Sequence, residues 1–132
     1  MTTYASYIST ISGVSITGVT TQLDYTPLVL HTADLPASFV RLPGGGMNMD
    51  TATTCSGDGR RRVCELVVAM EPLGQSNQEP NWTAVIAMMD YIEAALDTLF
   101  GSSLFTYDLA AGQEPIGDAI HWIITTTCEL IE

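Results

Sequence analysis

The positive charge of this sequence is gathered at one place, where it could bind carboxylates or phosphates. The stretch SGDGRRRVCELVVAM, residues 56–70, contains Arg60, Arg61 and Arg62, which are three of the four arginine and lysine residues in the chain. Arginine binds carboxylates through a bidentate fork. Three roles are open: a charged tip that blocks edge-to-edge aggregation, docking on an acidic surface of a neighbouring subunit, and contact with DNA phosphates. The acidic character of the rest of the chain argues against the DNA role.

A second group of charged residues is acidic. Asp90, Glu93 and Asp97 are spaced i, i+3 and i+7, so they would follow one side of a helix. Carboxylates can bind Mg²⁺ or Ca²⁺, but this stretch has no Gly-rich phosphate loop, no nearby basic residue and no second carboxylate cluster. A charged border of the helix is the simpler interpretation. Like charges near a helix C-terminus are destabilising, so a positive group from outside, such as the arginine triplet, would relieve them.

The remaining reactive side chains form no catalytic motif. His31 and His121 lie far apart in the sequence, and His121, beside a tryptophan, is typical of a packed histidine. No GxSxG, HExxH, P-loop or GxGxxG pattern occurs. The three cysteines, Cys55, Cys64 and Cys128, have no CxxC spacing and are expected to be reduced thiols. The sequence therefore predicts neither an enzyme nor a cofactor nor a metal site.

The composition limits the classes of protein that remain. The 132 residues suit one domain, residues 1–132, and carry a net charge of -11 with only 14% charged residues against 46% hydrophobic ones. So little charge predicts a surface that neighbouring subunits partly cover. The acidic balance argues against tight nucleic-acid binding, although it suits a channel through which DNA slides without sticking. No secretory signal or membrane span is recognised, which predicts synthesis in the cytoplasm.

The elements that position these residues begin with a short helix and two strands. Apolar residues at i, i+3, i+4 and i+7 predict an N-terminal helix, with Thr2 or Thr3 as its N-cap and Gly13 as its end. The segment VSITGVTTQLDYTP, residues 14–27, is rich in β-branched residues and predicts a strand. ASFVRLP, residues 37–43, alternates and predicts another, joined to the first by an irregular connection.

A long hairpin is expected next. Residues 47–55 alternate after three glycines, SGDG makes a tight turn, and residues 60–70 run back. With Asp58 and Gly59 as the loop, Cys55 lies opposite Arg62, and Cys64 lies opposite Thr53. The arginine triplet would then sit at the tip of a projecting hairpin.

The strongest periodicity predicts a helix over residues 82–100, ended by Gly101. Its apolar stripe, expected to face the sheet, contains Trp82, Val85, Ile86, Met89, Ile92, Leu96, Leu99 and Phe100. Its outer face is uncharged and includes Ala87, Tyr91 and Ala94. Such a face is either an alanine-rich solvent face or a contact face for another subunit.

The C-terminal part is predicted to be a loop followed by a strand. Residues 101–119 are long for a connection, which indicates a functional loop or a hidden short element. Residues 120–130 alternate and predict a central strand. The order of elements predicts an α+β fold, with a mostly antiparallel sheet, a long projecting hairpin and two helices packed on one face.

Several of these segments together resemble one protein family. They are the LPASFVRLPG strand, the long hairpin, the helix that begins at PNW and reads DYIEAALDTLF, and the closing strand IHWIITTTCELIE. This pattern, over nearly the whole chain, resembles the tail terminator proteins of long-tailed bacteriophages and prophages. The absence of lysine and the run of three glycines depart from it.

The resemblance implies a structural virion protein and not an enzyme. Its partners would be copies of itself in a six-membered ring, the tail tube protein, and a neck or head-completion protein. The ring would cap the tail tube at the top of the tail, end its polymerisation and join it to the neck, with DNA passing through the lumen. Subunit or partner contacts would then involve the arginine triplet, the acidic border and the outer helix face.

Two other functions remain open. Another head-to-tail joining protein or a tail-tube protein would form rings by the same physical means, and the position in the virion would separate these. A small acidic ligand-binding domain would require a concave pocket lined by convergent polar groups.

Overall fold

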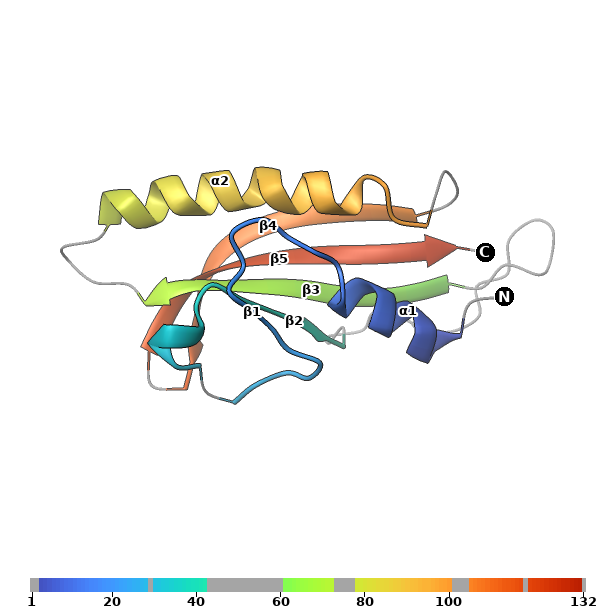
Figure 1. Cartoon of the computed structure of the whole chain (residues 1–132), viewed down its shortest axis with the longest axis horizontal. Helices are drawn as coiled ribbons and strands as arrows, with labels where there is room; N and C mark the ends of the chain where they lie inside the picture. Colours follow the sequence, from blue (N-terminus) through green and yellow to red (C-terminus); the bar gives the residue numbers. More distant parts are fainter. Residues whose placement is uncertain are drawn as a thin grey trace.

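The chain folds as an α+β protein in which helices cover one face of a sheet (Figure 1). The structure, a computed structural model, describes residues 3–28, 30–42, 61–72, 78–100, 105–117 and 119–131. Five strands form one sheet in the order β1-β2-β3-β5-β4. β1 runs parallel to β2, and every other neighbouring pair is antiparallel. The predicted fold class is confirmed.

The elements have the following bounds along the chain. They are α1 (Tyr4–Ser12), β1 (Thr21–Gln22), the 3₁₀ turn η1 (Thr32–Asp34), β2 (Ala37–Arg41), β3 (Arg61–Pro72), α2 (Gln78–Leu96), β4 (Phe105–Ile116) and β5 (Ala119–Ile131). The predicted central position of the last strand is confirmed, because β5 lies between β3 and β4.

The N-terminal helix forms as predicted. The Thr3 hydroxyl accepts a hydrogen bond from the Ser6 amide at 3.1 Å, which satisfies one of the free donors of the first turn. Gly13 ends the helix. Tyr7 and Ile11, one helical turn apart, are fully buried against the sheet. Capping and one apolar stripe therefore fix α1 in place.

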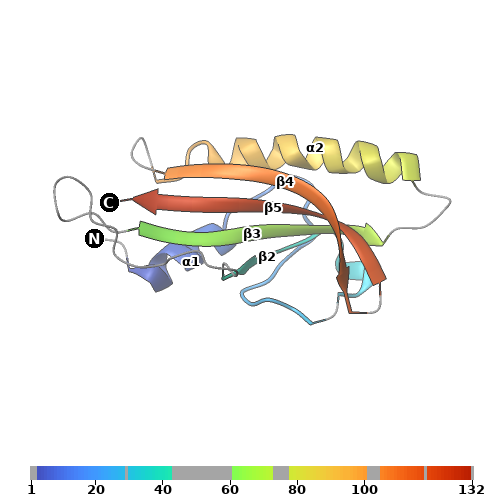
Figure 2. The same ribbon diagram turned by 180° about the vertical axis from the view of Figure 1, so that it is seen from behind.

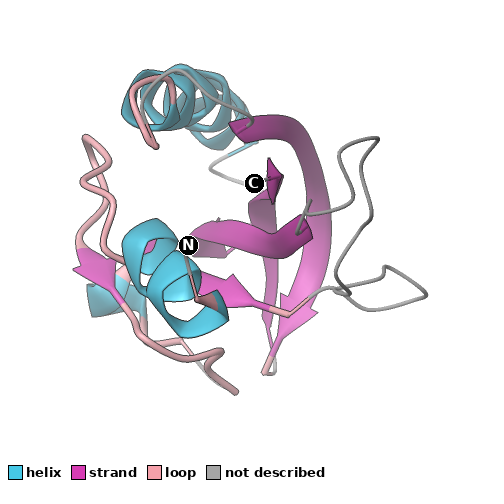
Figure 3. Cartoon of the chain, turned by 90° about the vertical axis from the view of Figure 1, so that its right-hand side faces the viewer, coloured by secondary structure: helices cyan, strands magenta, loops and turns pink. Residues whose placement is uncertain are grey.

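Both helices pack on the same face of the sheet (Figure 3). On this helix-covered face, β3 contributes Cys64, Leu66, Val68 and Met70 to the larger core, with α1 and α2 above them. The opposite face holds a smaller core, in which Phe39, Val67 and Ile123 meet. Because β3 is buried on both faces, its sequence is a nearly continuous apolar run.

The expected strand over residues 14–27 is wrong for most of its length. Only Thr21–Gln22 pair with β2. Gly18 turns the chain at a φ of 88° just before it, and a Cβ there would lie 3.4 Å from the Met88 side chain. The β-branched residues Val14 and Ile16 are instead buried in the larger core, together with residues of both helices. Their apolar character reflects core packing and not strand pairing.

Of the two alternatives for residues 101–119, the functional loop is wrong and the hidden element is present, but that element is a long strand and not a short one. β4 occupies Phe105–Ile116 and pairs with β5 along its whole length. Small and polar residues, with Gly112 and Pro115 among them, hid the alternation of Phe105, Tyr107 and Leu109. Glycine and proline are tolerated here because β4 is an edge strand.

The predicted hairpin over residues 47–70 is only partly open to test. Its first strand and turn, and with them the pairings of Cys55 and Thr53, lie outside the described residues. Its second half is β3, which pairs with β2 on one side and β5 on the other. The described part of this segment is therefore the centre of the sheet.

Candidate functional site

The apolar stripe of α2 is placed differently from the prediction. Val85, Ile92 and Leu96 are buried as expected, and Met88 joins them. Trp82 and Ile86 are 56% and 47% exposed, so their predicted core position is wrong. The line of buried residues is rotated about the helix axis relative to the predicted stripe, toward Met88 and away from Trp82 and Ile86. That rotation turns the two exposed side chains toward the flank of α2 that lies beside β4.

At this flank two tryptophans meet. The rings of Trp82 on α2 and Trp122 on β5 pack edge to face, with centroids 5.9 Å apart. Trp122 is half-buried, whereas Trp82 keeps more than half of its surface in solvent. An exposed indole beside the exposed Ile86 side chain makes an apolar patch at the N-terminal end of α2.

The predicted contact residues on the outer face of α2 are accessible. Ala94 is exposed, Ala87 is half-buried and Tyr91 is 42% exposed. The Tyr91 ring borders the turn at Gly18, where a Cβ would lie 3.8 Å from its Cδ2. This side of the helix is thus uncharged and open at its centre. The N-terminal segment approaches it along one border.

The acidic border of α2 follows the side next to β4. Asp90, Glu93 and Asp97 are all exposed. Asp97 has a partner within the chain, because the Tyr107 hydroxyl of β4 donates a hydrogen bond to its carboxylate. This hydrogen bond, with smaller effects of burial and of nearby carboxylates, raises the pKa of Tyr107 to about 12. The partner of Asp97 thus lies outside its own helix, on β4, and is a neutral hydroxyl and not an arginine.

Of the arginine triplet, the structure describes the side chain of Arg62. Arg60 lies outside the described residues, and the side chain of Arg61 at the start of β3 does as well. Arg62 is only 9% exposed, on the helix-covered face opposite Leu130 of β5. It lies near Tyr4 of α1, where its charge partly offsets the effect of burial on the Tyr4 pKa. For Arg62, the expected exposed tip is wrong.

An ion-pair cluster that sequence reasoning missed lies on the opposite face of the sheet. The Arg41 guanidinium donates from Nε to Glu65 at 2.6 Å and from Nη1 and Nη2 to Glu114 at 3.2 and 3.5 Å. Partial burial opposes the charge of Arg41, but these hydrogen bonds outweigh it and raise its pKa. Glu114 lies in the segment that was predicted to be a loop, so the sequence held no signal for this cluster.

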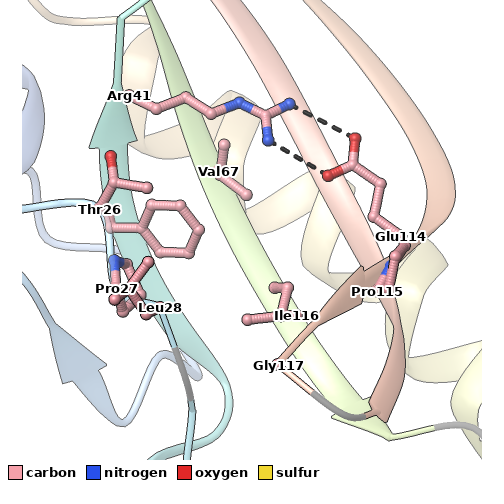
Figure 4. A pocket seen from close by; sticks show the side chains of 10 residues that line it. Thr26, Pro27, Leu28, Arg41, Val67, Glu114, Pro115, Ile116 and Gly117 are labelled. Carbon is pink, nitrogen blue, oxygen red and sulfur yellow. Dashed lines mark hydrogen bonds and ion pairs between the residues drawn. The ribbon is translucent and has the colours of Figure 1, made fainter.

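A groove of about 190 Å³ opens beside this cluster (Figure 4). Phe39, Val67 and Ile116 supply apolar side chains to it, and the Arg41–Glu114 pair spans its upper rim. The segment from Thr26 to Leu28 forms its other wall. The groove thus combines an apolar surface with one compensated cation.

The buried thiols and His121 have structural surroundings. Cys64 and Cys128 lie directly opposite each other on β3 and β5, are fully buried and are not bridged. Their shared hydrogen bond and burial raise the pKa of Cys128. His121 is 1% exposed, and its Nδ1–H donates to the Met70 carbonyl at 2.8 Å, so it is a packed histidine as predicted.

Within the described ranges, the structure contains no group of three or more His, Cys, Asp and Glu side chains that could hold a metal ion. In the same ranges, no helix is long and apolar enough to cross a membrane. The candidate sites are therefore surfaces: the exposed faces of α2, the groove beside Arg41, and the edge of β4, which among the described strands pairs only with β5. No protein-family model matches the chain, and no curated protein matches it at a significant level.

Proposed function

We propose that this chain is a structural subunit of a ring that caps the tail tube of a long-tailed bacteriophage or prophage, ends tail polymerisation and joins the tail to the neck. The family pattern of the sequence suggests the role. The observation that carries it is the accessible, uncharged outer face of α2, centred on Ala87, Tyr91 and Ala94.

This face has the properties of a contact between subunits. Small side chains allow another backbone to approach closely, and Tyr91 offers a large apolar ring with a polar tip. A solvated helix would usually carry lysine and glutamate at such positions, and the chain contains no lysine at all. In a ring, the next copy covers this face in every subunit, so the low charge of the face favours each of these contacts.

The net charge of -11 supports the passage of DNA through such a ring. Phosphates bind where basic side chains release their counterions, and an acidic lumen offers few of these. DNA would then move past the subunits without being held. We therefore assign no specific DNA-binding residues.

The test is the assembly state of the purified protein, alone and with isolated tail tubes. Light scattering after size exclusion measures the number of subunits, and electron microscopy of gold-labelled tails locates them. The proposal predicts six-membered rings at the top of the tail. Rings located along the tube or on the head side of the neck would instead favour a tail-tube protein or another joining protein.

A charge placed on the outer face of α2 should block assembly without unfolding the chain. Ala94→Glu puts a carboxylate at an exposed helical position in the proposed contact, and Ala5→Glu makes the same change at an exposed position of α1. We expect Ala94→Glu to remain monomeric while Ala5→Glu assembles like the parent. Equal assembly of both variants would contradict a contact through this face.

The groove supports a second candidate, a ligand-binding domain. Its apolar walls and the Arg41–Glu114 pair are the kind of convergent lining that such a function requires. A monomeric protein whose Phe39 and Val67 NMR signals shift on addition of small apolar fragments would favour this candidate over the ring.

A further inference from the structure

β4 forms an edge of the sheet, and its position suggests a use. Among the described residues, β4 pairs only with β5, so its other side is an open row of backbone groups (Figure 2). The strand extends over twelve residues, Phe105–Ile116, whereas β1 at the opposite edge has two. A long open edge is a template for pairing with another strand.

The turn between β4 and β5 defines which amides face outward. Ile116 and Ala119 are register partners on either side of a two-residue loop that begins at Gly117, whose φ is 67°. Residues flanking such a loop bond to each other through their backbones, so the N–H and C=O groups of even-numbered residues of β4 point to β5. The N–H and C=O groups of the odd-numbered residues therefore point to the open side. Pro115 falls among these, where its missing N–H costs no pairing with β5.

The open side thus presents a regular set of backbone donors. They are the amides of Phe105, Tyr107, Leu109, Ala111 and Gln113. Their side chains lie on the helix-covered face, next to the flank of α2 that carries Trp82 and Glu93. A strand added here would therefore contact α2 as well as β4.

The two surfaces beside this edge are acidic at one end and apolar at the other. Glu93 and Asp97 line it on the α2 side, where Asp97 bonds to Tyr107, and the exposed Asp108 lies on the other face. Toward Gln113, which pairs with Trp122, the exposed Trp82 and Ile86 side chains replace the carboxylates.

We infer that the open edge of β4 binds an extended basic segment of a second protein, which adds a strand to the sheet. Backbone hydrogen bonds would supply the pairing, and lysine or arginine side chains on the added strand would meet Glu93, Asp97 and Asp108. The inference does not depend on the ring, because it concerns a different surface from the outer face of α2.

A second copy of this chain suits the edge poorly. Each copy has a net charge of -11, and its four basic residues are all arginines. Of these, Arg41 is engaged with Glu65 and Glu114, and Arg62 is buried. Arg61 begins β3, which β5 separates from β4, and Arg60 precedes it in the sequence, so strand pairing of β4 with the β4 of a second copy adds no arginine to the edge. Two copies meeting at β4 would bring their carboxylates together. The charge pattern therefore favours a basic partner of different sequence.

The experiment uses the full chain and a short synthetic peptide of alternating valine and lysine. Residue-resolved amide hydrogen exchange by NMR should show new protection at the odd-numbered amides of β4, while its even-numbered amides, already bonded to β5, stay unchanged. The protection should weaken as salt rises, because the attraction is between exposed charges. A peptide of alternating valine and glutamate should give no protection.

Two variants test the edge itself. Ala111→Pro removes an outward N–H without touching the pairing with β5 and should weaken peptide binding about tenfold. Asp108→Asn should weaken it about two- to fivefold, whereas Asp24→Asn, the same change at an exposed residue before Pro27, should leave it unaltered. The two aspartate variants keep the test valid if the proline variant does not fold.

Other results would overturn the inference. These are protection without the odd–even alternation, equal binding of the lysine and glutamate peptides, and equal effects of Asp108→Asn and Asp24→Asn. Protection of the odd-numbered amides without peptide, growing with protein concentration and with salt, would show that a second copy occupies the edge and would also reject the basic partner.

Discussion

Arg41 on β2 and Glu114 on β4 are in contact, with Nη1 to Oε2 at 3.2 Å, although β3 and β5 lie between their strands in the sheet. The contact is possible because the sheet coils and the end of the β4–β5 hairpin turns back over the smaller core (Figures 2 and 4). The pair therefore links two distant parts of the sheet across the groove.

The two partners of this contact should differ in their effects on stability. Glu114→Gln should lower the free energy of unfolding by less than about 1 kcal/mol, because the Glu114 side chain is 44% exposed. Arg41→Met should cost about 1 to 3 kcal/mol, since it leaves the 18%-exposed Glu65 carboxylate without its cation. Urea unfolding of both variants measures this, and equal losses would contradict a larger contribution of the Arg41–Glu65 ion pair than of the Arg41–Glu114 pair.

Trp82 should contribute less to stability than a fully buried residue of the same helix. Trp82→Ala should cost about 1 kcal/mol, well below the 3 to 5 kcal/mol of a core tryptophan, because its side chain is 56% exposed. Ile92→Ala on the same helix, at a fully buried position, should cost about 2 to 5 kcal/mol. Thermal and urea unfolding decide between these values. A loss for Trp82→Ala as large as that for Ile92→Ala would restore Trp82 to the core.

The elements that could be predicted are those whose own sequence determines them. α1 has an N-cap, an apolar stripe and a terminating glycine within the segment itself, and β5 alternates over its whole length. The existence of α2 followed from its periodicity, but its rotation did not. The apolar side chains Trp82 and Ile86 match the helical repeat as well as Met88 does, and only packing against the sheet selects the buried set.

The missed features depend on contacts between distant segments. Val14 and Ile16 read as strand residues because burial and strand pairing favour the same side chains. β4 was missed because an edge strand tolerates glycine, proline and polar residues, which are also the residues of loops. The Arg41–Glu114 contact and the Cys64–Cys128 register follow from sheet order, which no local pattern encodes.

The paired thiols should be unreactive in the folded protein. Cys64 and Cys128 are fully buried, and the raised pKa of Cys128 keeps its thiol protonated. In a Cys55→Ser variant, a thiol reagent at mildly alkaline pH should label neither cysteine until denaturant is added, and both afterwards. Rapid labelling before denaturation would show that α1 does not cover the pair in solution.

Alkaline pH should loosen the contact between α2 and β4. The pKa of Tyr107 is raised from 10.0 to about 12 in the folded chain, first by its hydrogen bond to Asp97. Its contribution to stability is therefore complete below pH 10.0 and is lost as the pH rises toward about 12. Asp97→Ala should lower this pKa toward its ordinary value. NMR titration of the labelled Tyr107 ring measures both, and an unchanged pKa would show that Asp97 is not the cause.

Arg62 should behave differently from the other two members of the arginine triplet. Arg62→Ala should lower the free energy of unfolding by about 1 to 3 kcal/mol, because Arg62 is 9% exposed and lies near Tyr4.

Arg60→Ala with Arg61→Ala tests the remaining hypothesis, that these arginines dock on an acidic surface of a neighbouring subunit or tail protein. Each exposed pair contributes only about 0 to 1 kcal/mol, but a ring repeats it in every subunit. We expect this double variant to keep its melting temperature and to assemble or attach to tails more weakly, with the parent also loosening as salt rises. Assembly and infectivity equal to those of the parent would show that the two arginines only keep the chain from aggregating.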